Sequence, residues 1–234
     1  MDRAQALELL RRHCAEERLF RHALASEAVL KALALRLGQD PEAWGLAGLL
    51  HDLDYDQTAG QMNRHGLVTA QLLAPHGLPA ETLAAIAAHN AENLGLTRVT
   101  PLDFALTCGE TITGLVTATA YVHPDKKLAS VKPKSVVKRM KEKAFAASVN
   151  RDHIRLCEQL GIPLDQFAAL ALAPRPVLLI SPDPLGQGAS SAWAQGGVAA
   201  AMAPPDSAAA HAADTLRAGA GLVERQQVAL PEVQ

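Results

Sequence analysis

Apolar residues recur at three- and four-residue spacing along most of the chain up to about residue 172, which is the period of an amphipathic helix. The stretch RLFRHALASEAVLKALALRLG shows this pattern, and Gly38 ends it where a helix C-terminus favours glycine. Asp40 and Pro41 then predict the N-cap and first turn of a helix that runs through Leu50. Further helices are predicted over 64–74, 79–92, 101–122, 133–147, 150–160 and 163–172. Since no strand alternation competes with these helices, we predict an all-α fold for residues 1–172.

The composition changes after Leu172. Seven of the 14 prolines follow it, together with glycine-rich and alanine-rich stretches. Only Val177 to Ile180 has the apolar character of a short strand. We therefore predict two parts: a helical domain over 1–172, and an extension over 173–234 that holds at most a β-strand plus a helix and does not fold by itself.

The formal net charge is −2, which argues against a general nucleic-acid or membrane-surface binder, because those proteins need a broad basic field. One basic segment stands out. Residues 126–143 hold eight basic residues and one acidic residue, against 14 basic and 23 acidic residues elsewhere. This segment fits either a solvated helix face or a patch that faces an anionic substrate.

Three cysteines, far apart and without CxxC spacing, favour neither a disulfide framework nor a zinc knuckle. We expect a reducing, cytoplasmic location. The N-terminal segment MDRAQALELLRRHC interrupts its apolar residues with charges, so it does not resemble a secretory signal. The uncharged run over 184–205 is too rich in Gly, Ser, Gln and Pro to span a bilayer. A homodimer stays open, because the apolar residues of 101–122 fit core burial and a dimer contact equally well.

A polar pair, His51 and Asp52, follows the apolar run LAGLL. At the end of a helix, an imidazole and a carboxylate on adjacent residues can both bind one metal ion, and the carboxylate can bridge two ions. Further ligands must come from other helices. Four residues with apolar neighbours on successive predicted helices are candidates: His22, His65, His89 and Glu110.

The order of His22, then His51 and Asp52, then a late acid resembles the HD-domain superfamily of metal-dependent phosphohydrolases, and more narrowly its small HDIG-type proteins. The segments LLHDLDYD, RHGLVTAQLL, AIAAHN, ITGLV, HPDKKLASVKPKSVVKRMKEKAFAASVNRDHI and LGIPLDQFAALALA extend the resemblance from about residue 18 to 172. Two positions depart from that pattern. The motif His-Asp-Ile-Gly becomes His-Asp-Leu-Asp and ends at Asp54, and Glu110 stands where the subgroup has its last Asp.

The resemblance implies an all-α HD-domain helical bundle and the hydrolysis of a phosphomonoester or phosphodiester, with nucleotides among the candidate substrates. It implies a first metal held by His22, His51, Asp52 and Glu110, and a second held by His65 and His89 with Asp52 as the bridge. Asp52 and Asp54 are the candidate catalytic residues, since Asp54 either orients water, accepts its proton or caps the next turn. Four lysines are candidates for binding the phosphorylated substrate: Lys126, Lys127, Lys132 and Lys134.

Histidine-rich sites favour Mn²⁺, Fe²⁺, Co²⁺, Ni²⁺ or Zn²⁺ over Mg²⁺, so one or two such ions are expected. Two alternatives remain open. Some HD-domain relatives are di-iron oxygenases, for which the same ligands would serve. A degenerate metal-binding or regulatory module is the other, because of Glu110 and of the unusual C-terminal segment.

That segment, LLISPDPLGQGASSAWAQGGVAAAM followed by DSAAAHAADTLRAGAGLV, resembles an internal piece of L-aspartate oxidase. Five residues match that family's segment along the bound FAD: Ser190, Ser191, Gln195, Gly196 and Gly197. The GxGxxG turn that binds the pyrophosphate is absent. The resemblance therefore predicts a junction near 172–176, with no FAD bound and no aspartate oxidation.

Overall fold

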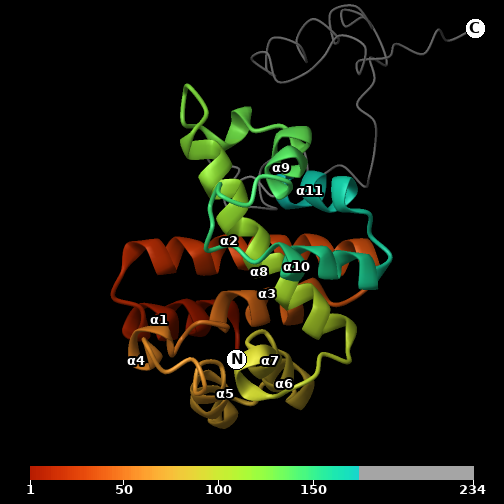
Figure 1. Cartoon of the computed structure of the whole chain (residues 1–234). Helices are drawn as coiled ribbons and strands as arrows, with labels where there is room; N and C mark the ends of the chain where they lie inside the picture. Colours follow the sequence, from red (N-terminus) through yellow and green to blue (C-terminus); the bar gives the residue numbers. More distant parts are fainter. Residues whose placement is uncertain (174–234) are drawn as a thin grey trace, which may run out of the picture. The chain divides into compact units, whose positions relative to one another are not determined.

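Three helices form the centre of the structure, a computed structural model that describes residues 1–173. Helices α2 (Glu17–Leu37) and α3 (Pro41–Leu50) pack side by side, and the long helix α8 (Pro101–Tyr121) crosses both (Figure 1). Leu30 and Leu33 of α2 and Ile112 of α8 are fully buried between them. Burial of apolar side chains on all three helices is the main force that holds this arrangement together.

The local signals for helix ends are confirmed. Gly38 adopts a left-handed conformation with φ of 68°, and its backbone N–H bonds to the last turn of α2. The Asp40 carboxylate accepts hydrogen bonds from the backbone N–H groups of Glu42 and Ala43 and so caps α3. Thr100 caps α8 in the same way, through a reciprocal pair of bonds with Asp103. These caps fix where each central helix begins or ends.

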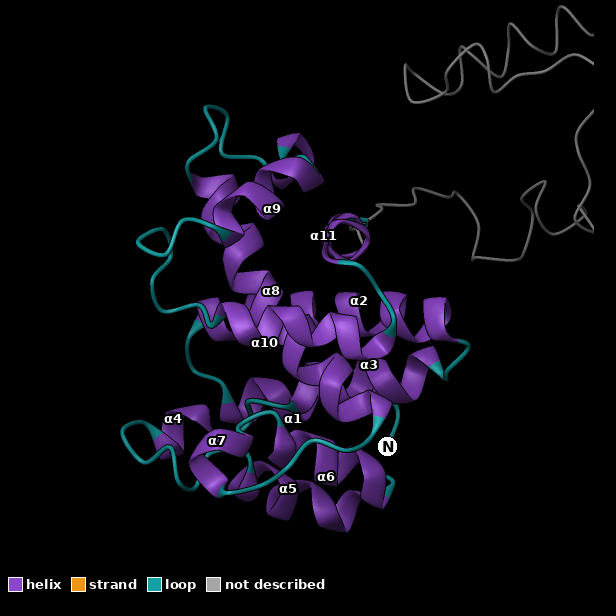
Figure 2. Ribbon diagram, turned by 45° about the vertical axis from the view of Figure 1, so that its right-hand side comes forward, coloured by secondary structure: helices purple, strands orange, loops and turns teal. Residues whose placement is uncertain are grey.

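The other helices surround this centre (Figure 2), and within residues 1–173 there is no β-strand. The all-α prediction is therefore confirmed for the described part. The remaining α-helices are α1 (Arg3–His13), α4 (Tyr55–Thr58), α5 (Leu67–Leu73), α6 (Ala80–Ala88), α7 (Ala91–Leu94), α9 (Pro133–Met140), α10 (Arg151–Arg155) and α11 (Leu164–Leu172). Three 3₁₀ turns complete the list: Ala74–His76, Leu128–Ser130 and Leu156–Leu160.

The helix predicted over 133–147 is too long, because α9 ends at Met140. The reason is a distant side chain. The Arg151 guanidinium donates to the backbone carbonyls of Glu142, Phe145, Ala146 and Val149. Carbonyls bound to this guanidinium do not need a helical hydrogen-bond ladder, so the segment folds into turns.

The predicted helices over 64–74 and 79–92 are also interrupted, in both cases beside a candidate ligand. Turns precede α5, which starts only after Gly66, and α6 ends at Ala88, directly before His89. The segment predicted over 150–160 is helical but divides into α10 and a 3₁₀ turn. The predicted helices over 101–122 and 163–172 are confirmed to within one residue.

The described residues end at Ala173, so the predicted strand over 177–180, the helix after it and the FAD-like segment lie outside them. Among the helices of residues 1–173, none is long and apolar enough to cross a membrane. Leu106, Ile112 and Leu115 of α8 are buried within this part of the chain, so core packing accounts for these apolar positions. The homodimer stays a prediction.

Candidate metal centre

The six candidate ligands come from different helices or from the turns at their ends. The side chains are His22 in α2, His51 and Asp52 at the end of α3, His65 in the turn before α5, His89 after α6, and Glu110 in the middle of α8. The structure brings them into one cluster, although 88 residues of sequence separate the first from the last. His51, His65 and His89 are buried, and His22, Asp52 and Glu110 are partly exposed.

Close packing of α3 against α2 sets the position of His51. A Cβ atom at Gly48 would lie 2.8 Å from the backbone carbon and oxygen of Ser26, so only glycine permits this approach. The His51 Nδ1 atom donates to the Gly48 carbonyl at 2.8 Å. This bond turns the other ring nitrogen, Nε2, towards α2 and α8.

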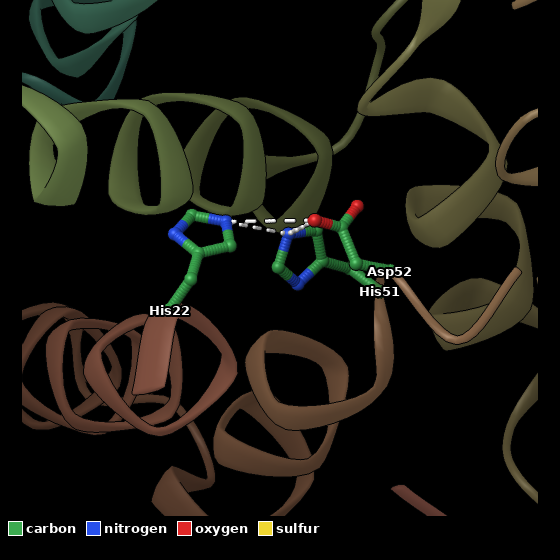
Figure 3. A group of neighbouring side chains, drawn as sticks. All are labelled: His22, His51 and Asp52. Carbon is green, nitrogen blue, oxygen red and sulfur yellow. Dashed lines mark hydrogen bonds and ion pairs between the residues drawn. The ribbon is translucent and has the colours of Figure 1, made fainter. Parts of the chain in front are cut away.

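His22, His51 and Asp52 form the first group of convergent atoms (Figure 3). The Nε2 atoms of the two histidines lie 3.2 Å apart. Asp52 Oδ2 lies 3.6 Å from His22 Nε2 and 3.3 Å from His51 Nε2. Three potential ligand atoms therefore surround one point.

The other carboxylate oxygen of Asp52 faces a second group, with His65 and His89. Asp52 Oδ1 lies 3.2 Å from His65 Nε2 and 3.6 Å from His89 Nε2. The two histidine Nε2 atoms lie 3.0 Å apart. Asp52 thus joins two groups of ligand atoms, one through each oxygen.

Hydrogen bonds assign the proton of three histidines to Nδ1. His51 and His89 direct Nδ1 at the backbone carbonyls of Gly48 and Ile86, which can only accept. His22 directs Nδ1 at Thr113 Oγ1, 2.9 Å away, and the Thr113 hydroxyl donates its own proton to the Glu110 carbonyl. In the neutral form of each ring, Nε2 therefore carries the free lone pair that a metal ion requires.

His65 has a charged partner instead. Its Nδ1 atom lies 2.7 Å from Asp54 Oδ1. The other Asp54 oxygen accepts from the backbone N–H groups of Gly66 and Thr69 at 2.8 and 2.9 Å, and Asp54 is fully buried. Asp54 therefore lies beside the two groups and contacts the ligand His65, and its predicted role towards water stays a prediction.

A divalent transition metal fits these donors. Bonds of about 2.0–2.2 Å place two ligand atoms of one ion about 3–3.5 Å apart. The distances between ligand atoms in the two groups, 3.0 to 3.6 Å, are close to that range. Opposed lone pairs repel, and a cation between them removes the repulsion. The residues present therefore suit one ion in each group.

Burial and mutual charge shift the pKa values of the cluster in opposite directions. Burial opposes ionisation of Asp52, but His51, His65 and His89 together hold its pKa well below the usual range. Burial also acts against the charge on His65, yet Asp52 and Asp54 raise its pKa to about 9. The pKa of His22 falls to about 4 through burial and the nearby charge of His51. Asp52 is therefore ionised, and its negative charge favours a cation at this site.

Glu110 lies at the edge of the first group. Its Oε2 atom is 3.8 Å from His22 Nε2, while Oε1 accepts a hydrogen bond from the Thr111 hydroxyl. Burial raises the pKa of the Glu110 carboxyl to about 7. Because Glu110 belongs to neither of the two closely spaced groups, its role as a ligand stays a prediction.

The four predicted substrate lysines are all exposed, in the segment that follows α8. This segment turns back along α8, since Leu128 lines a small cavity together with Ala25 and Thr113. Within residues 1–173, no hydrogen bond or ion pair links these lysines to the six candidate ligands. Their role in substrate binding stays a prediction.

Several supporting residues were not predicted from the sequence. Thr113 follows Glu110 by three residues and so shares its face of α8, a signal that was available. Arg98 carries no such signal: its guanidinium donates to the His89 carbonyl at 2.9 Å and pairs with Glu92. Gly66 has a φ of 86°, and a Cβ there would lie 3.0 Å from the Ile86 carbonyl. These contacts hold the backbone around His65 and His89.

Fold and site together define an all-α domain with a carboxylate that joins two histidine-rich groups of potential metal ligands. The model of the HD domain family matches residues 19–118. This range includes all six candidate ligands, and it confirms the resemblance to that family over these residues. No solved structure matches the chain.

Curated relatives support the other resemblance, the one to L-aspartate oxidase. The chain is 57% identical over 62 residues to L-aspartate oxidase from Agrobacterium fabrum, and 59% identical over 64 residues to L-aspartate oxidase from Caulobacter vibrioides. These matches cover 26% and 27% of this chain. The chain spans only 12% of the length of each relative, consistent with the predicted internal fragment.

Proposed function

We propose that the chain is a metal-dependent phosphohydrolase that cleaves a phosphomonoester or phosphodiester, with nucleotides among the candidate substrates. The observation that carries this proposal is the Asp52 carboxylate, whose two oxygens face separate pairs of histidines. The match of residues 19–118 to the HD domain family supports the same reaction class. This match identifies a family and does not identify a substrate.

In this proposal His22, His51 and Asp52 hold one ion, with Glu110 beside them, and Asp52, His65 and His89 hold the other. Bound divalent ions would lower the pKa of water and stabilise charge on the phosphoryl oxygens. Asp52 is the central residue, because it sets the spacing of the two positions through its two oxygens. In the neutral form of each ring, which is the form that binds a metal, the Nδ1 contacts of the histidines direct the Nε2 lone pair into the site.

The donor set selects the kind of ion. Four imidazole nitrogens and few oxygens favour Mn²⁺, Fe²⁺, Co²⁺, Ni²⁺ or Zn²⁺ over Mg²⁺. In the same proposal, the exposed lysines of 126–134 attract the anionic substrate from solution, an effect that salt would weaken. The three cysteines are buried and unpaired, which suits the reducing, cytoplasmic location expected from the sequence.

The test is a screen of the full chain loaded with Mn²⁺, Co²⁺ or Ni²⁺ against phosphomonoesters, phosphodiesters and nucleotides. Asp52→Asn should abolish turnover. Asp56→Asn is the matched control, because this exposed carboxylate lies four residues away and accepts a hydrogen bond from the Ala15 backbone N–H. Metal-dependent turnover that Asp52→Asn abolishes and Asp56→Asn preserves would support the proposal.

The same preparation separates the alternatives. A di-iron oxygenase, loaded with Fe²⁺ without air, would consume oxygen on exposure and turn over no phosphoester. A regulatory module would bind metal and do neither. Metal-loaded protein without phosphoester turnover would therefore reject the hydrolase proposal, and oxygen consumption would then decide between the other two.

For the part after residue 172, we propose that it forms a separate segment that neither binds FAD nor oxidises aspartate. The matched relatives are about eight times longer than the shared segment, and the GxGxxG turn of a dinucleotide site is absent from this chain. Purified protein should show no flavin absorbance. A stoichiometric flavin spectrum would overturn this proposal.

A further inference from the structure

We propose that Asp54 is a positioning residue that keeps His65 in its metal-binding tautomer and so controls occupancy of the metal position formed by Asp52, His65 and His89. This inference rests on the proposed metal centre and adds a residue that acts through a ligand. It also assigns a role to a residue at which this chain departs from the His-Asp-Ile-Gly pattern, since Asp54 stands where that pattern has glycine.

The geometry ties Asp54 to His65 rather than to solvent. Asp54 is 0% exposed, and its Oδ1 atom lies 2.7 Å from His65 Nδ1. A carboxylate is an acceptor only, so this contact requires the proton on Nδ1. In the neutral ring, which is the form that binds a metal, the lone pair of His65 then lies on Nε2, which is 3.2 Å from Asp52 Oδ1 and 3.0 Å from His89 Nε2.

Only an ionised carboxylate satisfies all the partners of this side chain. Its Oδ2 atom accepts two backbone N–H bonds, from Gly66 and Thr69, while Oδ1 accepts from His65. An asparagine at this position has one acceptor oxygen and one NH₂ group. The two backbone donors would bind the amide oxygen, and the NH₂ group would then face His65 Nδ1. That ring would accept at Nδ1 and carry its proton on Nε2, where it blocks a metal.

The other three histidines do not depend on a charged partner. His51 and His89 donate to backbone carbonyls, and His22 donates to the Thr113 hydroxyl. A substitution at Asp54 should therefore weaken one metal position and leave the one at His22 and His51 in place. Loss of such a supporting partner lowers metal affinity by about 10- to 100-fold in other metal sites.

The experiment is a titration of the metal-free full chain with Mn²⁺, followed by calorimetry and by electron paramagnetic resonance. Wild type should bind two ions and show the spectrum of a coupled Mn²⁺ pair. Asp54→Asn should bind one ion tightly, bind the second about 10- to 100-fold more weakly, and show an uncoupled spectrum. Two ions bound by Asp54→Asn with unchanged affinity would overturn the inference.

Thr69→Val is the matched control, because the Thr69 hydroxyl accepts from the Asp54 backbone N–H, and its removal leaves the bonds of the Asp54 carboxylate to His65 and to the backbone in place. It should keep both ions. Equal loss of the second ion in both variants would mean that general loosening of the turn, and not the carboxylate, causes the effect, and would also overturn the inference. Circular dichroism shows whether each variant is folded.

A measurement on wild type covers the case in which Asp54→Asn does not fold. Nitrogen-15 NMR of the histidine rings in Zn²⁺-loaded protein reports which ring nitrogen carries the proton. His65 should be protonated at Nδ1 with Nε2 bound to metal, and protonation at Nε2 would reject the inference. Two bound ions with no phosphoester turnover would reject the proposed function alone, whereas no metal uptake by wild type would reject both.

Discussion

The Nε2 atoms of His22 and His51 lie 3.2 Å apart, although each ring already directs its other nitrogen at a hydrogen-bond acceptor. Two neutral rings in this state present lone pairs to each other, an arrangement that is unfavourable without a positive charge between them. The same relation recurs between His65 and His89. A pair of histidines opposed in this way, twice around one carboxylate, is the strongest structural support for a metal centre.

Thr113→Val should weaken the ion held by His22 and His51. The substitution keeps the volume of the side chain but removes the acceptor for His22 Nδ1–H. The His22 ring can then also adopt the tautomer with its proton on Nε2. We expect about 10-fold weaker binding of one Mn²⁺ and about 1–2 kcal/mol less stability. Calorimetric titration measures the first effect and thermal unfolding the second.

Thr119→Val is the control for this prediction. Thr119 is a buried threonine of the same helix, and its hydroxyl donates to the Leu115 carbonyl without contacting the site. It should cost stability and leave metal affinity unchanged. If Thr113→Val bound two ions as tightly as Thr119→Val does, the hydrogen bond to His22 would have no role in the metal site.

Gly48→Ala should destabilise the fold and displace His51. The added Cβ would meet backbone atoms of Ser26 at 2.8 Å, and helix backbone cannot move aside as a side chain can. Overpacking of this kind costs about 1–3 kcal/mol. Since the Gly48 carbonyl also receives His51 Nδ1–H, a shift of α3 should lower metal affinity too.

Gly45→Ala, one turn earlier on α3, provides the comparison. The atoms nearest to its added Cβ would belong to the flexible Lys31 side chain, which can move away. We expect little change in the midpoint of denaturant unfolding for this variant. Equal stability of the two variants would show that α2 and α3 are not packed as closely as the structure has them.

Glu92→Gln should reduce stability near neutral pH but not in strong acid. Arg98, which binds both carboxylate oxygens, lowers the pKa of Glu92 from 4.5 to about 2. A lowered pKa adds stability that is complete above pH 4.5 and is lost as the pH falls through about 2. The side chain is 52% exposed, so solvent screening limits the effect to roughly 1 kcal/mol or less.

This prediction is checked by urea unfolding of metal-free protein between pH 2 and pH 7. The difference between wild type and Glu92→Gln should shrink towards zero as the pH approaches 2. Glu8→Gln removes an exposed pair with Arg12 and should have a smaller effect throughout. A difference for Glu92→Gln that stays constant over the whole range would contradict the assigned ion pair.

The fold was predictable wherever local signals decide it. Gly38 and Asp40 carry out the roles in helix ends that their residue types indicate, and the apolar period predicted α2, α3 and α8. The end of α9 was not predictable, because it depends on Arg151, which is eleven residues away from Met140 and binds carbonyls that a helix would otherwise use. The spacing of apolar residues does not report a hydrogen bond from a distant side chain.

The candidate site was also predictable only in part. The order of histidines and carboxylates along successive helices was enough to select the six residues that the fold brings together. The hydrogen bonds behind them were not visible in that order, since Thr113 and Asp54 act through partners 91 and 11 residues away. Whether Asp54 faced water or a ligand depended on the path of the turn between α4 and α5.

The most direct test of the central claim is the metal content of the full chain, purified without added metal or chelator and compared with Asp52→Ala. Because each oxygen of Asp52 faces one group of histidines, the account predicts about one to two equivalents of transition metal in wild type and almost none in the variant. Wild type that contains no metal and takes up none on titration would contradict it, as would an Asp52→Ala variant that retains the same content.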